Sequence, residues 1–364
     1  MPTIDTSLHE SRRTLRESSK LLAGAGHCHP ADELERVAAY IRANDITPDN
    51  YGSGIVVEDL ETKVADLFGM EAARYMPSGC MAQAIALRIW AERVGVFETA
   101  FHATSHLELH EERGYSALHR LKAHLLGDST RPTLACDLEG LAPISSLLIE
   151  LPAREIGGQL PTWDELVELT SAARAKRIRL HLDGARLWEA QAFYDRPFTE
   201  ICGLFDSVYV SFYKGIGALA GAMLLGPRDF VDEAVQWQRR QGGTLHSALA
   251  NIVSAKMRLD QQLERMPSYR KRAAEVAAIW NEFEGARTLP EEPQVNMFHL
   301  LLEGDGDELL LARDRAASEH GLWLVNYLNT EGDRARCEIT IGDAALELAD
   351  DELRAAIGSF LQRD

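Results

Sequence analysis

The chain has little of what marks several large classes of protein. Its 364 residues include five cysteines, with no CxxC pair and no Cys/His pattern at metal-ligand spacing. An odd number without such spacing argues against a disulfide framework and predicts a reducing compartment and no structural metal. No run of eighteen apolar residues occurs, and the first twenty residues are too polar for a signal peptide. We therefore expect a cytoplasmic protein with no membrane partner.

The chain also has fewer basic than acidic residues. Lys and Arg number 38 against 56 Asp and Glu, which gives a net charge of −18. Because a phosphate backbone demands a basic face, this balance argues against a nucleic-acid partner. The length and the 46% apolar content are sufficient for a large core and more than one domain. We expect an N-terminal segment at 1–50, a large domain at 51–250 and a small C-terminal domain at 251–364.

A lysine stands between two apolar runs at residues 208–226, VYVSFYKGIGALAGAMLLG. This pattern predicts a strand, a glycine-rich turn that holds Lys214, and a return strand. Taking an ammonium group out of water costs several kcal/mol unless the group is paired. A lysine that forms a Schiff base with pyridoxal phosphate (PLP) avoids that cost. Lys214 is therefore a candidate for cofactor attachment, and the alternative is a solvated lysine at the tip of a hairpin.

A carboxylate ends a second predicted strand, in the segment RLHLDGARLW at residues 179–188. Alternation places His181 and Asp183 on one face of that strand. A carboxylate there can keep the pyridine nitrogen of PLP protonated, or it can cap the helix that follows. Lys214 comes thirty-one residues after Asp183, which leaves room for one helix and one strand. Neighbouring strands of one sheet would bring both side chains to one site.

The segment at 72–91, AARYMPSGCMAQAIALRIWA, predicts a strand, a turn and a helix. Backbone N–H groups at the start of that helix, together with the Ser78 hydroxyl, suit a phosphate group. The alternative is an ordinary turn between a strand and a helix.

Strands and helices alternate along much of the chain. An apolar strand at 145–151 and a helix at 162–177 precede the Asp183 strand, which predicts βαβ units and a mainly parallel sheet. Further helices are expected at 31–44, 57–69 and 228–243, and two helices between 248 and 283. The C-terminal part should hold strands near 295–302, 322–327 and 336–341.

Four segments together resemble the threonine aldolase and β-eliminating lyase family of PLP enzymes. They are YGSGIVVEDLETKVADLFGMEAARYMPSG (51–79), SHLELHEERG (105–114), HLDGARLW (181–188) and SFYKGIGALAGAMLLG (211–226). The resemblance implies fold type I, an α/β aspartate aminotransferase-like large domain with a seven-stranded-type, mainly parallel sheet and a small C-terminal α/β domain. It also implies a homodimer or homotetramer.

The resemblance assigns roles to individual residues. It implies that Lys214, Asp183 and His106 are catalytic, with the ring of His106 stacked on PLP and Glu111 matching the family as well. Its implied cofactor-binding residues are Ser78, Gly79, Cys80, His106, Asp183, Arg186, Ser211, Lys214 and His246. His246 follows the Gly242-Gly243 turn, which resembles a loop that serves a neighbouring subunit's cofactor. Tyr51 lies in a turn that the family places near the active site.

The chain departs from the family at the residues that would hold the substrate. Leu151-Pro152-Ala153-Arg154 stands where threonine aldolases carry a polar stretch with a histidine, so one candidate base is absent. Glu338 stands where the family has an arginine for the substrate carboxylate. Arg336 shares its strand face by the two-residue period, so Arg336 is the preferred carboxylate ligand and Arg154 the rival.

These observations predict a PLP-dependent lyase that cleaves or forms the Cα–Cβ bond of a β-hydroxy-α-amino acid and gives glycine and an aldehyde. One alternative is β-elimination from a serine- or cysteine-type amino acid. An aminotransferase is less favoured by the resemblance. A PLP-binding protein with little turnover is the alternative from a different class.

Overall fold

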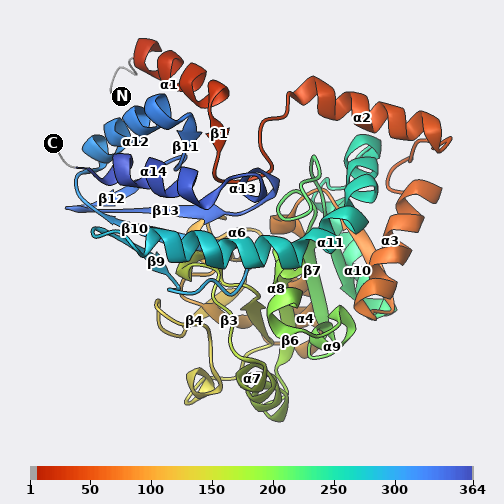
Figure 1. Cartoon of the computed structure of the whole chain (residues 1–364). Coiled ribbons are helices and arrows are strands. Elements are labelled where there is room, and N and C mark those ends of the chain that lie inside the picture. The colour runs from red at the N-terminus through yellow and green to blue at the C-terminus, as the bar shows by residue number, and fades with distance from the viewer. Residues whose placement is uncertain (1–5, 363–364) are drawn as a thin grey trace. The chain divides into compact units, whose positions relative to one another are not determined.

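The structure is a computed structural model that describes residues 6–362 (Figure 1). The chain divides into two compact units. One is Pro30–Arg265, and the other joins Met1–His29 to Met266–Asp364. Residues before the first helix of the larger unit therefore group with the C-terminal part of the chain. The boundaries at 50 and 250 that the sequence suggests stay a prediction about folding domains.

Within the described residues, the larger unit is built on a seven-stranded sheet. Its order is β2 (Ala72–Met76), β8 (Ala222–Gly226), β7 (Ser207–Ser211), β6 (Arg179–Gly184), β5 (Ser146–Glu150), β3 (Glu98–His102) and β4 (Lys122–Leu126). Neighbouring strands from β7 to β4 are parallel, and β8 runs antiparallel to both β2 and β7. The mainly parallel α/β sheet expected from the sequence is confirmed. The return strand after Lys214 is confirmed as well, because β7 and β8 pair directly.

The helices of this unit precede, separate and follow the strands along the chain. They are α2 (Pro30–Ala43), α3 (Ile55–Phe68), α4 (Gly79–Val94), α5 (His106–Leu109), α6 (Gly114–Ala117), α7 (Trp163–Ala175), α8 (Leu187–Tyr194), α9 (Phe198–Cys202) and α10 (Arg228–Arg240), with 3-10 turns η1 (Ala135–Leu138) and η2 (Arg154–Ile156). Helix α7 begins with a reciprocal cap, in which the Thr162 hydroxyl accepts from the Glu165 N–H and the Glu165 carboxylate accepts from the Thr162 N–H.

The core of this unit forms where helices α4 and α10 pack against the sheet. Tyr209 and Leu224, which face each other on β7 and β8, are buried together with Ile85 of α4. Trp90 of α4 stacks on Phe230 of α10 with ring centroids 4.8 Å apart. Burial of these large side chains contributes roughly 1.5–3 kcal/mol each, so α4 is held firmly against the strands whose ends form the site below.

The smaller unit holds a four-stranded antiparallel sheet among its described residues. Its order is β12 (Asn329–Glu331), β13 (Arg334–Thr340), β10 (Met297–Glu303) and β9 (Ala286–Leu289). The remaining elements are α1 (Thr6–Ser18), α12 (Gly306–His320), α13 (Asp343–Leu346), α14 (Asp350–Leu361) and a parallel pair of short strands, β1 (Lys20–Leu21) and β11 (Leu322–Trp323). The expected alternation on β13 is confirmed, because Cys337 and Ile339 are buried whereas Arg336 and Glu338 are only half-buried.

One expectation about the helices is wrong. A single continuous helix, α11 (Leu249–Trp280), replaces the two helices expected between 248 and 283. Pro267 lies inside it. Proline removes one backbone hydrogen bond from a helix, but the helix has buried residues both before and after Pro267, such as Leu259 and Ala273. The strand expected at 322–327 is also shorter, because β11 ends at Trp323.

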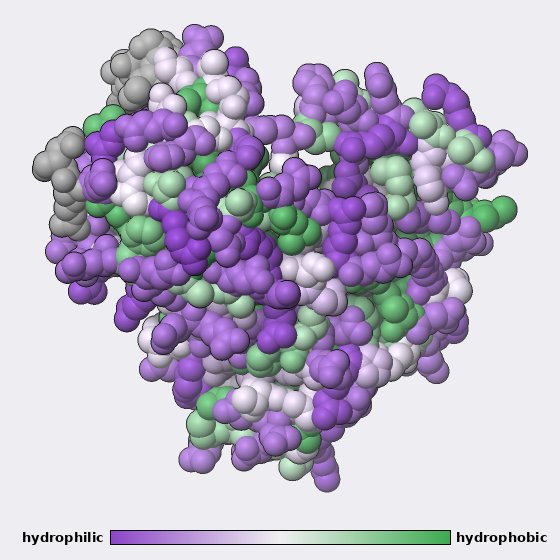
Figure 2. Space-filling model, viewed as in Figure 1, coloured by the Kyte–Doolittle hydropathy of each residue, from purple (hydrophilic) through white to green (hydrophobic). Residues whose placement is uncertain are grey.

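One face of the molecule is mainly polar. Figure 2 shows a predominantly hydrophilic face with hydrophobic residues scattered among polar ones. Among the described residues, no helix combines the length and apolar character that a membrane span requires.

Candidate active site

The site lies at the carboxyl ends of neighbouring strands in the larger unit, where ligands bind in open α/β sheets. Asp183 near the end of β6 faces Glu150 at the end of β5 across the parallel ladder. Lys214 follows β7, the strand on the other side of β6. These side chains line one pocket with others from α4, α5 and η2. The lining residues are Cys80, Gln83, His106, Glu111, Glu150, Pro152, Arg154, Asp183, Ala185, Arg186, Tyr209, Tyr213 and Lys214.

Lys214 is positioned by the glycine-rich connection between β7 and β8, at residues 212–221. The Ala218 N–H donates to the Phe212 carbonyl at 2.9 Å, and the turn passes through Gly217 at a φ of +69°. That conformation favours glycine over residues with a side chain. Burial, reinforced by the nearby Arg186, lowers the pKa of Lys214. A larger fraction of neutral amine makes the lysine a better nucleophile toward an aldehyde.

Asp183 is a buried carboxylate beside that lysine. Its exposed fraction is 3%, and its Oδ1 atom accepts a hydrogen bond from the Ala185 N–H at 3.0 Å. Burial raises the pKa of Asp183, while Lys214 and the Ala185 N–H oppose the shift. A buried carboxylate of this kind binds a cationic or N–H ligand group strongly.

The start of helix α4 forms another wall of the site. The Ser78 hydroxyl caps the helix by accepting from the Met81 N–H at 3.3 Å. Gly79 fits closely over the Tyr209 ring, since a methyl group there would overlap the ring's hydroxyl end. Helix N–H groups and a close backbone approach are the features that suit a phosphate.

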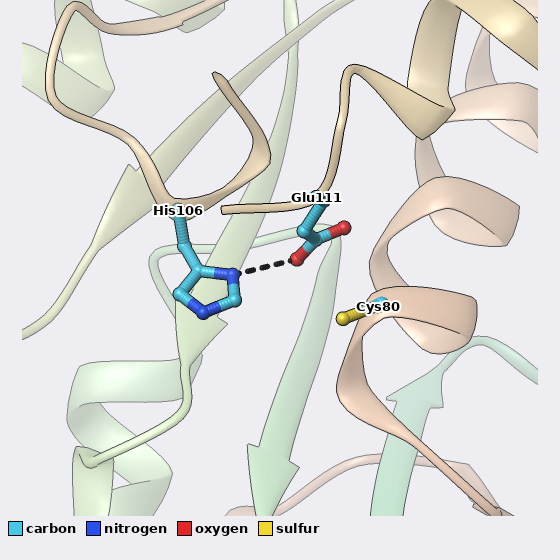
Figure 3. A group of neighbouring side chains, drawn as sticks. All are labelled: Cys80, His106 and Glu111. Carbon is cyan, nitrogen blue, oxygen red and sulfur yellow. Dashed lines mark hydrogen bonds and ion pairs between the residues drawn. The ribbon is translucent and has the colours of Figure 1, made fainter. Parts of the chain in front are cut away.

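His106, Glu111 and Cys80 come together in the lining of the site (Figure 3). The Nδ1 atom of His106 lies 2.9 Å from Oε1 of Glu111, which fixes the orientation of the ring. One ligand-type atom from each of the three residues lies within 4.8 Å of the others. Burial, with the Glu111 carboxylate adding to it, raises the pKa of the Cys80 thiol to about 11, so this thiol stays protonated at neutral pH.

Arg154 and Arg186 bring two guanidinium groups to the pocket lining. Arg154 donates to Glu155 Oε1, and His110 Nε2 lies 2.9 Å from the same oxygen. Arg186 precedes α8, with its Nε atom 4.0 Å from Glu189. The structure therefore places one of the two predicted carboxylate ligands, Arg154, in the same pocket as Lys214.

Other predicted site residues do not line this pocket. Among them are Ser78 and Gly79, although the next residue along the chain, Cys80, does line it. Ser211 is buried, and its hydroxyl donates to the Ala185 carbonyl at 2.7 Å, which ties β7 to the loop after Asp183. Tyr51 and His246 contact each other, with ring centroids 5.2 Å apart. Arg336 lies on β13 in the other unit and lines a hollow of that unit.

The sequence reasoning missed several pocket residues, namely Gln83, Glu150, Tyr209 and Tyr213. Glu150 carried a usable signal, since it is an acidic residue that ends an apolar strand directly before the Asp183 strand. Tyr213 adjoins Lys214 but offered no pattern of its own.

The donor set fits PLP. An aldehyde requires an amine of lowered pKa, which Lys214 supplies. A protonated ring nitrogen requires a buried carboxylate, which Asp183 supplies. A phosphate requires backbone donors, which the start of α4 offers beside Gly79.

Comparison with known proteins gives a consistent family. The family model described as beta-eliminating lyase matches residues 28–302. A candidate L-allo-threonine aldolase from Listeria monocytogenes superposes with a TM-score of 0.92 at 41% identity, over 96% of this chain and 98% of that one. A candidate aromatic amino acid beta-eliminating lyase/threonine aldolase from Exiguobacterium gives 0.92 at 38% identity, over 96% and 99%. The protein named Aldolase vrtJ from Penicillium aethiopicum is 30% identical over 86% of this chain and 80% of its own length.

Proposed function

Since the chain belongs to the beta-eliminating lyase family of PLP-dependent, fold type I enzymes, we propose that it cleaves or forms the Cα–Cβ bond of a β-hydroxy-α-amino acid. The products of cleavage are glycine and an aldehyde. The observation that carries this proposal is that Lys214 and Asp183 line one pocket at the ends of adjacent strands. The name of the similar Listeria protein supports this choice of reaction, and that of the Exiguobacterium protein includes both threonine aldolase and beta-eliminating lyase.

The chain's own residues divide the work as follows. PLP, when bound, supplies an electron sink for the charge that develops at Cα. Lys214 attaches the cofactor and moves a proton at Cα. Asp183 holds the proton of the ring nitrogen. The ring of His106, oriented by Glu111, would contact the cofactor and take part in proton transfer from the β-hydroxyl.

Arg154 is proposed as the ligand of the substrate carboxylate. A guanidinium group binds a carboxylate through a planar fork that lysine lacks, and Arg154 lines the pocket that holds Lys214. Alanine at Arg154 should raise the apparent dissociation constant of the amino acid by roughly tenfold or more, matching about 1.5–3 kcal/mol for a charged hydrogen bond. Arg336→Ala is the matched variant. If only Arg336→Ala weakened binding of the amino acid, Arg336 would be the carboxylate ligand instead.

β-Elimination is the alternative reaction, with Lys214 acting as the base at Cα. The two reactions separate when the purified protein is given threonine, serine and cysteine in turn. Glycine and an aldehyde in equal amounts support the carbon-carbon lyase. Release of pyruvate and ammonia from serine or cysteine would replace it with the elimination reaction.

We also propose that the protein is at least a homodimer in the cytoplasm. Tyr51 is 59% exposed, and its N–H donates to the His246 carbonyl at 2.9 Å. An exposed aromatic pair next to the Gly242-Gly243 turn suits contact with a second copy. Sedimentation at assay concentration should give a dimer or tetramer, and a fully active monomer would contradict this.

A further inference from the structure

Glu150 is a pocket carboxyl group to which the proposed reaction gives no role. It ends β5, and its backbone partner across the parallel ladder is Asp183 of β6. Because residues opposite each other in a ladder point to the same face, both carboxyl groups project toward one pocket, which both line.

The two oxygens of Glu150 have different surroundings. Oε1 accepts a hydrogen bond from the His106 N–H at 2.9 Å. Oε2 is shielded from solvent and has no hydrogen-bond partner among the described residues. A buried anionic oxygen without a donor is costly, and protonation is the usual way in which that cost is reduced.

The neighbouring carboxylate makes full ionisation costlier still. Two carboxyl groups that share a water-poor site cannot both carry a charge without strong repulsion, so such a pair tends to hold one proton. Asp183 has the better support for a negative charge, because the Ala185 N–H donates to it and Lys214 favours its charged form. The proton of the pair therefore belongs on Glu150.

The charges around Glu150 agree with this assignment. Burial, followed by the repulsion from Asp183, raises the pKa of Glu150 to about 8. Glu155 of η2 adds to the shift, while the His106 N–H and Lys214 oppose it. The other charged groups that line the pocket are Arg154, Arg186 and Glu111.

We propose that Glu150 carries the proton of this carboxyl pair at neutral pH and so keeps Asp183 as the charged member that faces the cofactor. Glu150 is then a positioning residue, which acts through Asp183 and through the backbone of His106. The protonation of the carboxyl pair is argued from the geometry. Only the claim that Asp183 then faces the cofactor as the charged member rests on the proposed function.

Infrared difference spectroscopy of the cofactor-free protein tests the protonation directly. Wild-type protein at pH 7 should show the band of a buried protonated carboxyl group, and the band should titrate away with a midpoint near pH 8. Glu150→Gln should remove the band. Glu155→Gln is the matched control, since Glu155 is ion-paired with Arg154, and it should leave the band in place. A band that survives in Glu150→Gln but disappears in Asp183→Asn would overturn the assignment.

The holoenzyme supplies a second readout. Glutamine keeps an acceptor for the His106 N–H and imitates the neutral acid, whereas alanine does neither. Glu150→Gln should therefore exceed Glu150→Ala in turnover at pH 7 by about tenfold or more, and it should flatten the inflection near pH 8 in the dissociation constant of PLP. Equal losses in both variants would show that Glu150 works as an anion and would refute the proposal. If either variant fails to fold, the wild-type titration decides, since absence of a protonated-carboxyl band at pH 7 refutes the proposal as well. Product analysis with threonine, serine and cysteine tests the proposed function separately, so the two can fail independently.

Discussion

Replacing Gly79 with alanine tests whether the start of α4 must approach Tyr209 as closely as the structure shows. Gly79 is the first residue of α4, and its φ is outside the left-handed region. Alanine is therefore compatible with the backbone, and the added methyl group is the whole perturbation. That carbon would lie 2.9 Å from Cε2 of Tyr209 and closer still to Cζ and Oη.

The expected cost follows from how little room Tyr209 has to move. Tyr209 is 1% exposed and packs in the cluster of buried residues that includes Met76 and Ile85. Overpacking of this kind costs about 1–3 kcal/mol. A shift of the α4 N-terminus to relieve the overlap would also move the proposed phosphate donors. We expect the affinity for PLP to fall by about tenfold, which corresponds to ~1.4 kcal/mol.

Two measurements and one control check this prediction. Urea unfolding of the cofactor-free protein measures the loss of stability, and absorbance titration with PLP measures the loss of affinity. Gly114→Ala is the control, because Gly114 also begins a helix, α6, and has no atom within 4 Å of an added methyl group. That variant should be unchanged or more stable by up to about 1 kcal/mol. If Gly79→Ala matched the control in both measurements, the close packing of α4 on Tyr209 would be refuted.

Two further substitutions make specific predictions. Asp183→Asn should lower turnover by at least about a hundredfold, because a neutral amide does not hold the ring nitrogen protonated, and near-normal turnover would remove Asp183 from the mechanism. Since burial raises the pKa of Asp183 and disfavours its charge, the variant should unfold at the same or a higher urea concentration. Asp137→Asn should cost about 1–3 kcal/mol at pH 7, because Asp137 pairs with Arg131 at 2.7 and 2.8 Å and accepts from the Leu134 N–H. Arg131 holds the pKa of Asp137 below its ordinary value, so the contribution of Asp137 to stability is present above about pH 4 and is lost as the pH falls. Urea unfolding at pH 7 and pH 3 should show that the stabilities of wild type and Asp137→Asn converge at the lower pH. A stability difference that stays constant would contradict the ion pair.

Local patterns were sufficient for the parts of the site that lie on single strands. Two apolar runs around a glycine turn predicted β7, β8 and the place of Lys214, because short apolar runs on either side of a turn indicate buried strands. The Asp183 strand was predicted for the same reason. On β13, the two-residue period alone separated buried Cys337 and Ile339 from half-buried Arg336.

Features that depend on the order of strands in the sheet could not be predicted from the sequence. Glu150 ends an apolar strand, but its meaning comes from the neighbour relation of β5 and β6, which sets it opposite Asp183. Arg154 was predicted only as the rival carboxylate ligand, because it reaches the pocket through the η2 turn that follows β5, and no periodic pattern predicts such a turn. The sequence predicted two helices where the structure has the single helix α11, because tertiary packing overrides the local effect of Pro267.

Chemical reduction followed by peptide mapping tests the central claim most directly. The holoenzyme, reduced with borohydride and digested, should carry the reduced cofactor on the peptide that contains Lys214, and Lys214→Ala should carry none. A label on Lys63, Lys122 or any other lysine, or no label on protein that has bound PLP, would contradict the account of the site.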